Sequence, residues 1–376
     1  MPSPAPAPAA PPPAAVPIPL SSVIPPLILG TATFNTQYVA SPEHMPYTPI
    51  ISRALSLGIR AFDTSPYYGP SESLLGAALT SLSPPRDSYF LITKAGRRGP
   101  SDFDYSPAGI RSSVERSLAR LGTDRLDLVY CHDVEFVSPA DVLAAVSELR
   151  RLRSEGKVRY VGISGYPLPT LTSLSLSVLE ATGEPLDAVL SYSHFTLQNT
   201  SLSSPAVLSA FAAARVNVLL NASILGMGLL TSRGIDAAPM AAWHPAPPAL
   251  RSRCTELKTI AEAEGMGLEE VAIRWSLAGW ATAAAAFGSA SGGRNARTGV
   301  SVTGVSSVAE LEETWRVWSE VVSELEGGTP GAASKTDLVR RLAEERIWPA
   351  LGEWKDYTWE SPGPDYVPTG PSRPRL

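Results

Sequence analysis

The chain has 376 residues, of which 44% are hydrophobic and 18% are charged, and its formal net charge is −5. This is the composition of an ordinary soluble protein, and the length is ample for one large domain. The mild acidity offers no basic surface for nucleic acid and no polybasic segment for a membrane, so we expect small neutral or weakly polar partners, no nucleic acid and no membrane. Two cysteines, Cys131 and Cys254, are too few for a disulfide framework, which favours a reducing, cytoplasmic compartment.

The first 26 residues are almost all Pro and Ala, and they include no Lys, Arg, Asp or Glu. A signal or transit peptide would need basic residues, and the prolines would break a helical apolar region. We therefore expect residues 1–26 to form a disordered tail, partly in the polyproline II conformation.

From Leu27 onward, short apolar segments alternate with amphipathic helix patterns. In residues 106–121, Ile110, Val114, Leu118 and Leu121 recur at the spacing of one helix face. Eight strands alternating with helices predict an α/β fold, a (β/α)8 TIM barrel with parallel strands, over residues 27–326. An open doubly wound sheet is the alternative, but it would need a glycine-rich turn after the first strand. The expected strands are 27–29, 60–63, 89–93, 126–130, 158–163, 188–191, 217–221 and 300–303.

Three further segments complete the expected organisation. Residues 251–277 predict one long helix, whose apolar positions are read as core. Residues 288–299, rich in Gly and Ser, predict a flexible insertion before the eighth strand. Residues 327–376 form a C-terminal extension with a charged helix over 335–346 and an aromatic run of Trp354, Tyr357 and Trp359. The extension could fold over the mouth of the barrel or pack on its flank.

Polar side chains stand at the ends of three successive strands. Asp63 ends the second strand, and Tyr68 follows five residues later in a turn; Lys94 and His132 end the next two. Because the carboxyl ends of barrel strands share one mouth, we expect these four side chains to meet. A phenol is a poor base at neutral pH unless a cation stabilises its anion, and Lys94, oriented by Asp63, could be that cation. His132 could hydrogen-bond the substrate oxygen, and Tyr67 is the nearest alternative to Tyr68.

The sequence offers little for other chemistries. His44, His194 and His244 have no clustered Cys, Asp or Glu at metal-ligand spacing, so we expect no metal site. No Gly-x-Ser-x-Gly elbow and no phosphate-binding P-loop occur.

With these four residues in this order and at this spacing, the chain resembles the aldo-keto reductase superfamily over about residues 27–325. The resemblance is carried by residues 58–69 (GIRAFDTSPYYG), 131–133 (CHD), 156–164 (GKVRYVGIS) and 221–230 (NASILGMGLL). It implies that Asp63, Tyr68, Lys94 and His132 are the catalytic tetrad, with Tyr68 and His132 touching the substrate. Residues 131–136 (CHDVEF), 191–195 (SYSHF) and 243–246 (WHPA) are similar to the sugar dehydrogenases of that superfamily.

The resemblance also implies a dinucleotide extended across the mouth of the barrel. Small residues at strand ends would let backbone N–H groups approach the phosphates. Many relatives have Asn in place of Gly165 and Gln in place of Ser191, so the anchor of the nicotinamide carboxamide stays open. The implied cofactor contacts are Gly30, Thr31, Asp63, Ser164, Ser191, Ser223, Leu225, Gly304, Ser306, Ser307 and Glu310.

The segment after the eighth strand indicates which dinucleotide is used. In the NADPH-dependent relatives it carries Arg or Lys, which hold the 2′-phosphate. Here residues 303–313 contain neither, and Ser306 and Glu310 stand where the basic pair is expected. Glu310 could accept a hydrogen bond from a free ribose 2′-hydroxyl, although an acid also suits the first turn of a helix. We therefore expect NAD rather than NADP.

Together these features predict an NAD-dependent dehydrogenase that oxidises the C1 hydroxyl of an aldose to the lactone. The expected substrate is a sugar of the D-arabinose, L-galactose or L-fucose type. One alternative is an NADPH-dependent carbonyl or aldehyde reductase with the same tetrad. A second is a non-catalytic, nucleotide-binding regulatory barrel, which the intact tetrad disfavours.

Overall fold

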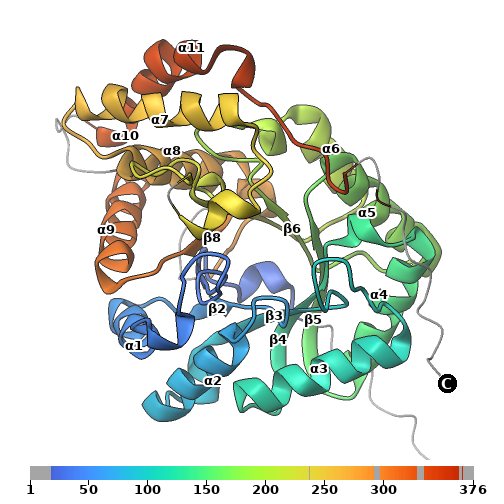
Figure 1. Cartoon of the computed structure of the whole chain (residues 1–376). Helices are drawn as coiled ribbons and strands as arrows, with labels where there is room; N and C mark the ends of the chain where they lie inside the picture. The colour runs from blue at the N-terminus through green and yellow to red at the C-terminus, as the bar shows by residue number, and fades with distance from the viewer. Residues whose placement is uncertain (1–17, 237, 292–296, 328–333, 364–365, 367–376) are drawn as a thin grey trace, which may run out of the picture.

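Eight parallel strands close into a barrel in this computed structural model, which describes residues 18–236, 238–291, 297–327, 334–363 and 366 (Figure 1). Each strand pairs with the next along the chain, and β1 also pairs with β8. The predicted (β/α)8 barrel is therefore confirmed, with all eight expected strands present. They are β1 Leu27–Gly30, β2 Ala61–Asp63, β3 Phe90–Ala95, β4 Leu126–His132, β5 Val158–Gly165, β6 Ala188–Tyr192, β7 Val218–Ala222 and β8 Val300–Gly304.

Helices surround the strands, and α1 packs against α9 to complete the ring. Local sequence sets their ends. Ser106 accepts a hydrogen bond from the backbone N–H of Gly109 at the start of α3, and Gly122 ends that helix in the left-handed conformation, at φ 64°. The helices are α1 Tyr47–Leu57, α2 Ser71–Leu82, α3 Pro107–Leu121, α4 Pro139–Ser154, α5 Leu168–Thr182, α6 Pro205–Ala213, α7 Pro248–Glu262, α8 Leu268–Ala283, α9 Val308–Leu325, α10 Lys335–Leu342 and α11 Trp348–Leu351.

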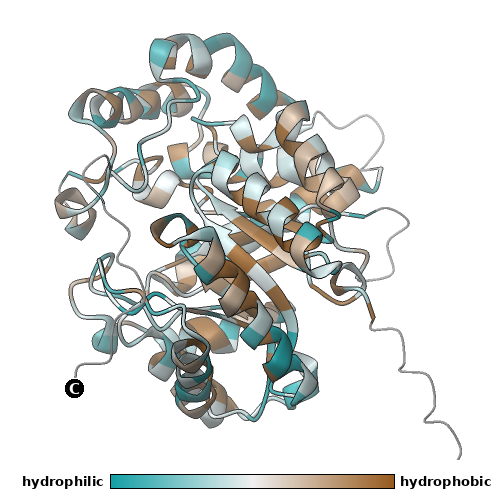
Figure 2. Cartoon of the chain, turned by 90° about the vertical axis from the view of Figure 1, so that its right-hand side faces the viewer, coloured by the Kyte–Doolittle hydropathy of each residue, from teal (hydrophilic) through white to brown (hydrophobic). Residues whose placement is uncertain are grey.

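The strands consist largely of hydrophobic residues, drawn brown in Figure 2, and these residues are buried on both faces. Successive side chains of a strand point to opposite faces. In β3, Phe90 and Ile92 fill the barrel interior, while Leu91 packs against the helices. This alternation decides which residue at each strand end faces the mouth of the barrel.

The expected single helix over residues 251–277 is wrong. Helix α7 ends at Glu262, and α8 begins at Leu268. Gly265 lies between them at φ 70°, a conformation that interrupts a right-handed helix and that glycine adopts at little cost. Helix α8 belongs to the ring, whereas α7 packs outside it with α10 and α11.

The disordered tail was expected to extend to residue 26, and the structure corrects its boundary. Residues 1–17 lie outside the described part of the chain, but Leu20 and Ile24 are fully buried against the interior side chains of the barrel. Ser21 N–H donates to Asn217 Oδ1 at 2.9 Å. The described residues before β1 thus close the amino-terminal end of the barrel, because apolar side chains there cover its core.

The insertion and the extension are described in part. Of the expected flexible segment 288–299, residues 292–296 lie outside the described residues, while Ser289 and Thr298 form an antiparallel bridge. In the extension, α10 and α11 pack on α7 and α8 beside the barrel (Figure 1), and the residues after α11 reach its mouth. No helix among the described residues has the length and apolar character needed to span a bilayer.

Candidate active site

A cavity of about 830 Å³ opens at the carboxyl ends of the strands, and all four expected catalytic residues line it. The alternation of side chains explains why. Asp63, Lys94, His132 and Ser164 each continue the inward-facing series of their own strand. Tyr68 joins them from the turn that follows β2.

Lys94 and Asp63 form a buried ion pair. Lys94 Nζ lies 2.6 Å from Asp63 Oδ1 and donates to the carbonyl of Thr64 at 2.9 Å, and both charged side chains are almost inaccessible to solvent. Burial alone would lower the pKa of Lys94, but the Asp63 carboxylate outweighs it, so the pKa is raised and the lysine stays charged. A fixed positive charge therefore stands beside the phenol of Tyr68.

Tyr68 lies between this charge and His132. Lys94 Nζ is 4.8 Å from the centre of the Tyr68 ring, and the rings of Tyr68 and His132 meet edge to face at 5.7 Å. Burial raises the pKa of the Tyr68 phenol, and Lys94 acts in the opposite direction. Tyr67, the alternative phenol, is engaged elsewhere, since its hydroxyl accepts a hydrogen bond from Arg97 at 3.2 Å. The geometry therefore favours Tyr68 as the group that exchanges a proton.

His132 is a neutral hydrogen-bond donor in this site. Burial lowers its pKa to about 3. The Ser65 hydroxyl accepts the backbone N–H of Tyr67 at 3.1 Å, so its own hydrogen is free to be donated to His132 Nδ1, 3.0 Å away. The ring proton then resides on Nε2, which lies 3.5 Å from Asp133 Oδ2. A neutral imidazole with its proton on Nε2 can donate to a substrate oxygen.

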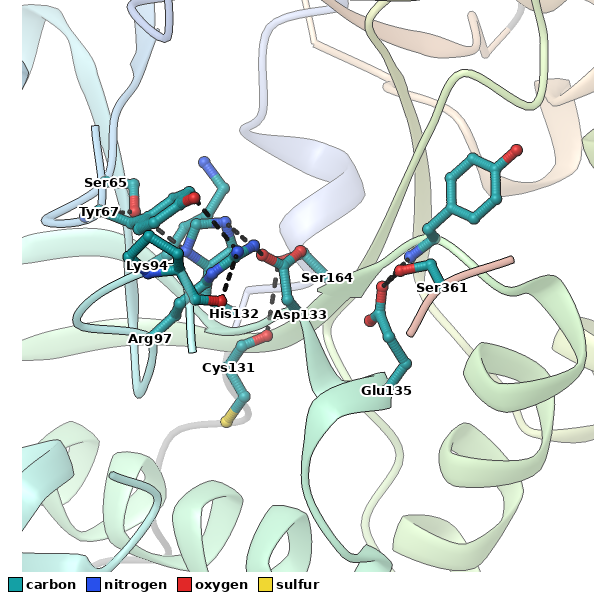
Figure 3. A network of polar contacts seen from close by, with 12 residues as sticks. Ser65, Tyr67, Lys94, Arg97, Cys131, His132, Asp133, Glu135, Ser164 and Ser361 are labelled. Atoms are coloured by element: carbon teal, nitrogen blue, oxygen red, sulfur yellow. Dashed lines mark hydrogen bonds and ion pairs between the residues drawn. The ribbon is translucent and has the colours of Figure 1, made fainter. Parts of the chain in front are cut away.

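Two cavity residues beside His132 were missed at the sequence level. Arg97 and Asp133 both line the cavity and form a partly buried ion pair with each other (Figure 3). Asp133 has φ 57°, in the left-handed region that Asp tolerates better than most residues. The run Cys-His-Asp places Asp133 next to His132 in the sequence, but the left-handed backbone at Asp133 brings its side chain into the same cavity.

The loop after β7 forms another wall of the cavity. The loop after β7 contributes Ser223 and Leu225 to the lining and has successive positive φ angles through Gly226, Met227 and Gly228. The backbone N–H groups of Gly226 and Gly228 donate to the carbonyls of Ser223 and Leu225 at 2.7 and 3.2 Å, so these bonds hold the loop in its turned conformation. Arg233, in the same loop, also lines the cavity and was missed; the structure gives it no ion pair with another described residue.

The segment between β8 and α9 forms the neighbouring wall. Gly304, Ser306 and Glu310 all line the cavity. The Glu310 carboxylate accepts from the backbone N–H of Ser306 at 2.6 Å and from its hydroxyl at 3.0 Å. A carboxylate rather than a cation therefore occupies this wall at the start of α9.

Three expected cofactor contacts do not reach the cavity. Thr31 and Ser191 belong to the outward-facing series of their strands: Thr31 bonds to Ser71 in α2, and Ser191 bonds to His194. Ser307 instead caps α9, accepting the backbone N–H of Glu310 at 3.2 Å. For Thr31 and Ser191 this placement follows from the alternation along the strand, which turns their side chains to the outer face of the barrel.

Gly165 has no room for the asparagine found in many relatives. A Cβ atom at this position would lie 2.4 Å from Glu135 Oε2. Burial raises the pKa of Glu135 to about 8, and its other oxygen accepts from Tyr166 N–H at 3.0 Å and from Ser361 at 3.2 Å. Glu135 thus fills the space at residue 165, and Figure 3 shows it beside Ser361.

The C-terminal extension supplies an aromatic wall. Trp359, Glu360 and Ser361 line the cavity. Trp359 stacks on Tyr166 with ring centres 4.8 Å apart, and its backbone N–H donates to the Tyr166 hydroxyl at 3.3 Å. Both expected placements of the extension occur: its helices pack on the flank of the barrel, and residues 359–361 lie at the mouth.

Two other histidines are buried near the mouth, and they are not arranged as metal ligands. His194 and His244 each have a pKa lowered to about 4 by burial. Among the described residues, no group of three or more His, Cys, Asp or Glu side chains could hold a metal ion.

Comparisons with known proteins agree with this geometry. The sequence profile of the Aldo/keto reductase family matches residues 26–327. D-arabinose 1-dehydrogenase of Saccharomyces cerevisiae is 43% identical over 261 residues, 68% of this chain and 76% of the relative. L-galactose dehydrogenase of Arabidopsis thaliana is 34% identical over 305 residues, 80% of this chain and 86% of the relative.

A solved structure supports the fold. Glycerol dehydrogenase from Gluconobacter oxydans superposes with a TM-score of 0.59 at 21% identity, covering 91% of this chain and 97% of that one. The closed barrel, the tetrad gathered at its mouth and the family match across residues 26–327 lead to one conclusion: the chain belongs to the aldo/keto reductase family and is an oxidoreductase.

Proposed function

We propose that this oxidoreductase uses NAD to oxidise the anomeric hydroxyl of an aldose to the lactone. The observation that carries the proposal is one cavity that holds the buried tetrad together with polar and aromatic walls, in a chain 43% identical to a D-arabinose 1-dehydrogenase. The L-galactose dehydrogenase relative supports a sugar of the same kind. The physiological sugar would be of the D-arabinose, L-galactose or L-fucose type, since one extra carbon in a pocket changes binding by only about 1–3 kcal/mol.

The four site residues divide the chemistry between them. Bound nicotinamide would supply the hydride acceptor. Tyr68, as the tyrosinate favoured by Lys94, would take the proton of the C1 hydroxyl while the hydrogen on C1 leaves with its electron pair. His132 Nε2–H would donate to the reacting oxygen and orient it. Asp63 would keep Lys94 charged and in place. The net change is a C1 hydroxyl converted to a carbonyl, with one hydride and one proton transferred.

The cofactor wall supports NAD over NADP. Ser306 and Glu310 face the cavity where a 2′-phosphate would need cations, and Glu310 would repel a phosphate dianion but could accept from a ribose hydroxyl. Among the residues that the structure describes, the Lys and Arg side chains that line the cavity are Lys94, Arg97 and Arg233, and the first two are held in ion pairs. The buried, unpaired Cys131 and Cys254 also fit a reducing, cytoplasmic setting.

The test is absorbance of the reduced nicotinamide with the purified protein, each dinucleotide in turn, and a panel of D-arabinose, L-fucose, L-galactose and simple aldehydes. The proposal predicts NAD-dependent oxidation of at least one of the three sugars. Turnover restricted to aldehyde reduction with NADPH would favour a carbonyl reductase instead. Nucleotide binding without turnover on any substrate would favour a regulatory barrel. Ranking kcat/KM on the three sugars would then identify the substrate class most directly.

A further inference from the structure

Resting on the proposed function, we propose that Asp133 is a substrate-recognition residue. Its carboxylate accepts a hydrogen bond from the hydroxyl on the carbon next to the reacting carbon. The site would thereby select polyhydroxylated substrates over simple alcohols and aldehydes.

The position of Asp133 relative to His132 is the first argument. Asp133 Oδ2 lies 3.5 Å from His132 Nε2, the atom that would hold the reacting oxygen. Hydroxyls on adjacent carbons can lie roughly 3 Å apart, about the length of one hydrogen bond. A substrate bound to His132 through its reacting oxygen therefore presents its neighbouring hydroxyl within reach of the Asp133 carboxylate.

The bonding of Asp133 is the second argument. Oδ2 is paired with Arg97, but the structure gives Oδ1 no hydrogen bond among the described residues, and the residue lines the cavity. Burial alone would raise the pKa of Asp133, but the charge and the hydrogen bond of Arg97 act in the opposite direction, and the pKa is lowered. An ionised carboxylate with one oxygen free is an acceptor that a sugar hydroxyl can satisfy.

Arg97 is a positioning residue for this carboxylate rather than a second sugar ligand. Its guanidinium lies 3.9 Å from the centre of the Tyr67 ring and also faces Phe103 and Phe136 at 5.3 and 5.2 Å. It also donates to Tyr67 and to the carbonyls of Gly99 and Pro100. These contacts leave few donors for a ligand, and they fix the side chain that orients Asp133.

The test compares substrates that differ by one hydroxyl in enzymes that differ by one functional group. D-arabinose and its 2-deoxy counterpart are oxidised by the wild type and by Asp133→Asn. Asparagine has the same shape and tolerates a positive φ, so the backbone is expected to persist. Asp102→Asn makes the same chemical change at an exposed carboxylate of the neighbouring loop and serves as the matched control.

The wild type and Asp102→Asn should prefer the parent sugar by on the order of 10- to 100-fold in kcat/KM, the range expected for a hydrogen bond to a charged group. In Asp133→Asn that preference should fall toward one, because kcat/KM drops on the parent sugar and much less on the deoxy sugar. An equal loss on both sugars would assign Asp133 a purely structural role and overturn the proposal.

A second substrate pair separates this inference from the proposed function. Lactaldehyde and propanal differ by the same hydroxyl, and their reduction with the reduced dinucleotide needs no sugar. Failure to oxidise any sugar would overturn the proposed function, while the lactaldehyde preference and its loss in Asp133→Asn would still support the role of Asp133. A wild type with equal kcat/KM on both aldehydes would overturn that role.

Discussion

Replacing Lys94 with methionine removes one half of a buried ion pair, and its cost can be worked from the structure. Nζ lies 2.6 Å from Asp63 Oδ1, with 2% and 5% of the two side chains exposed. Removing one partner of such a pair leaves an uncompensated charge and typically costs about 3–5 kcal/mol of unfolding free energy. The second oxygen, Asp63 Oδ2, is buried without a hydrogen bond, so no neighbour can take over the role of Lys94. Denaturant unfolding of Lys94→Met should show a loss of this size.

The same change should also affect turnover. With Lys94 Nζ 4.8 Å from the centre of the Tyr68 ring, the attraction to a tyrosinate is about 3 kcal/mol at an effective dielectric constant of ~20. Losing it should lower the rate of sugar oxidation at neutral pH by on the order of 100-fold. Oxidation by the wild type should rise with pH as the tyrosinate forms, and Lys94→Met should abolish that rise or move it to more alkaline pH.

A double variant distinguishes the two effects. In Asp63→Asn with Lys94→Met, the uncompensated charge is gone, so most of the lost stability should return. The activity should remain low, because no cation stands beside Tyr68. A Lys94→Met enzyme with the wild-type pH profile would refute the coupling between Lys94 and Tyr68, and recovery of activity in the double variant would refute it equally.

Three further predictions concern other parts of the site. Tyr68→Phe should leave folding and dinucleotide binding intact while kcat falls by about 10²–10⁴, the range of general acid–base catalysis, and a variant that keeps most of its kcat would reject this assignment. The wild type should favour NAD over NADP by at least ~10-fold in kcat/KM. The double variant Ser306→Arg with Glu310→Arg should narrow or invert that ratio, because each new hydrogen bond to a charged group is worth about 1.5–3 kcal/mol. A wild-type preference for NADP would contradict the assignment of Ser306 and Glu310 to the ribose end of the cofactor. Burial lowers the pKa values of His132, His194 and His244 to about 3 to 4. Below about pH 6.5 the unfolded chain therefore binds more protons than the folded chain. The unfolding free energy should fall by up to ~1.4 kcal/mol per histidine per pH unit from pH 6.5 toward 4. Glu135, whose pKa is raised to about 8, binds its proton in the folded chain and offsets the loss from about one histidine, so a net fall should remain. Unfolding curves that do not change between pH 7 and 5 would argue against these neutral, buried imidazoles.

The barrel and the meeting of the four polar side chains in one cavity could be predicted from sequence, because both follow from local pattern. Eight apolar segments separated by helices specify the strands, and each tetrad residue on a strand lies at the end of its own apolar segment. Thr31 and Ser191 look equally suitable by composition, yet they fall on the outward-facing series and bond to helix and loop residues. The direction of their side chains depends on the alternation along the strand, which the sequence encodes but which is easily miscounted by one residue.

Other features depend on contacts between distant segments. Arg97 lies in the loop after β3, and Asp133 follows β4 in a left-handed conformation that brings the two side chains together. No spacing in the sequence predicts this contact. The burial of Leu20 and Ile24 depends on the open end of a barrel that forms elsewhere in the chain. Trp359 lies at the mouth because the preceding helices, α10 and α11, pack on α7 and α8 and direct the chain there.

Hydride transfer from the anomeric carbon is the central claim, and isotopic labelling tests it most directly. D-arabinose, L-fucose or L-galactose carrying deuterium at C1 is incubated with the enzyme and NAD, and the nicotinamide and the sugar product are analysed by mass spectrometry. We predict deuterium on the reduced nicotinamide in amounts equal to the lactone formed, and formation of both products about 10²–10⁴-fold more slowly with Tyr68→Phe. Reduced nicotinamide without deuterium, or no lactone from any of the three sugars, would contradict it.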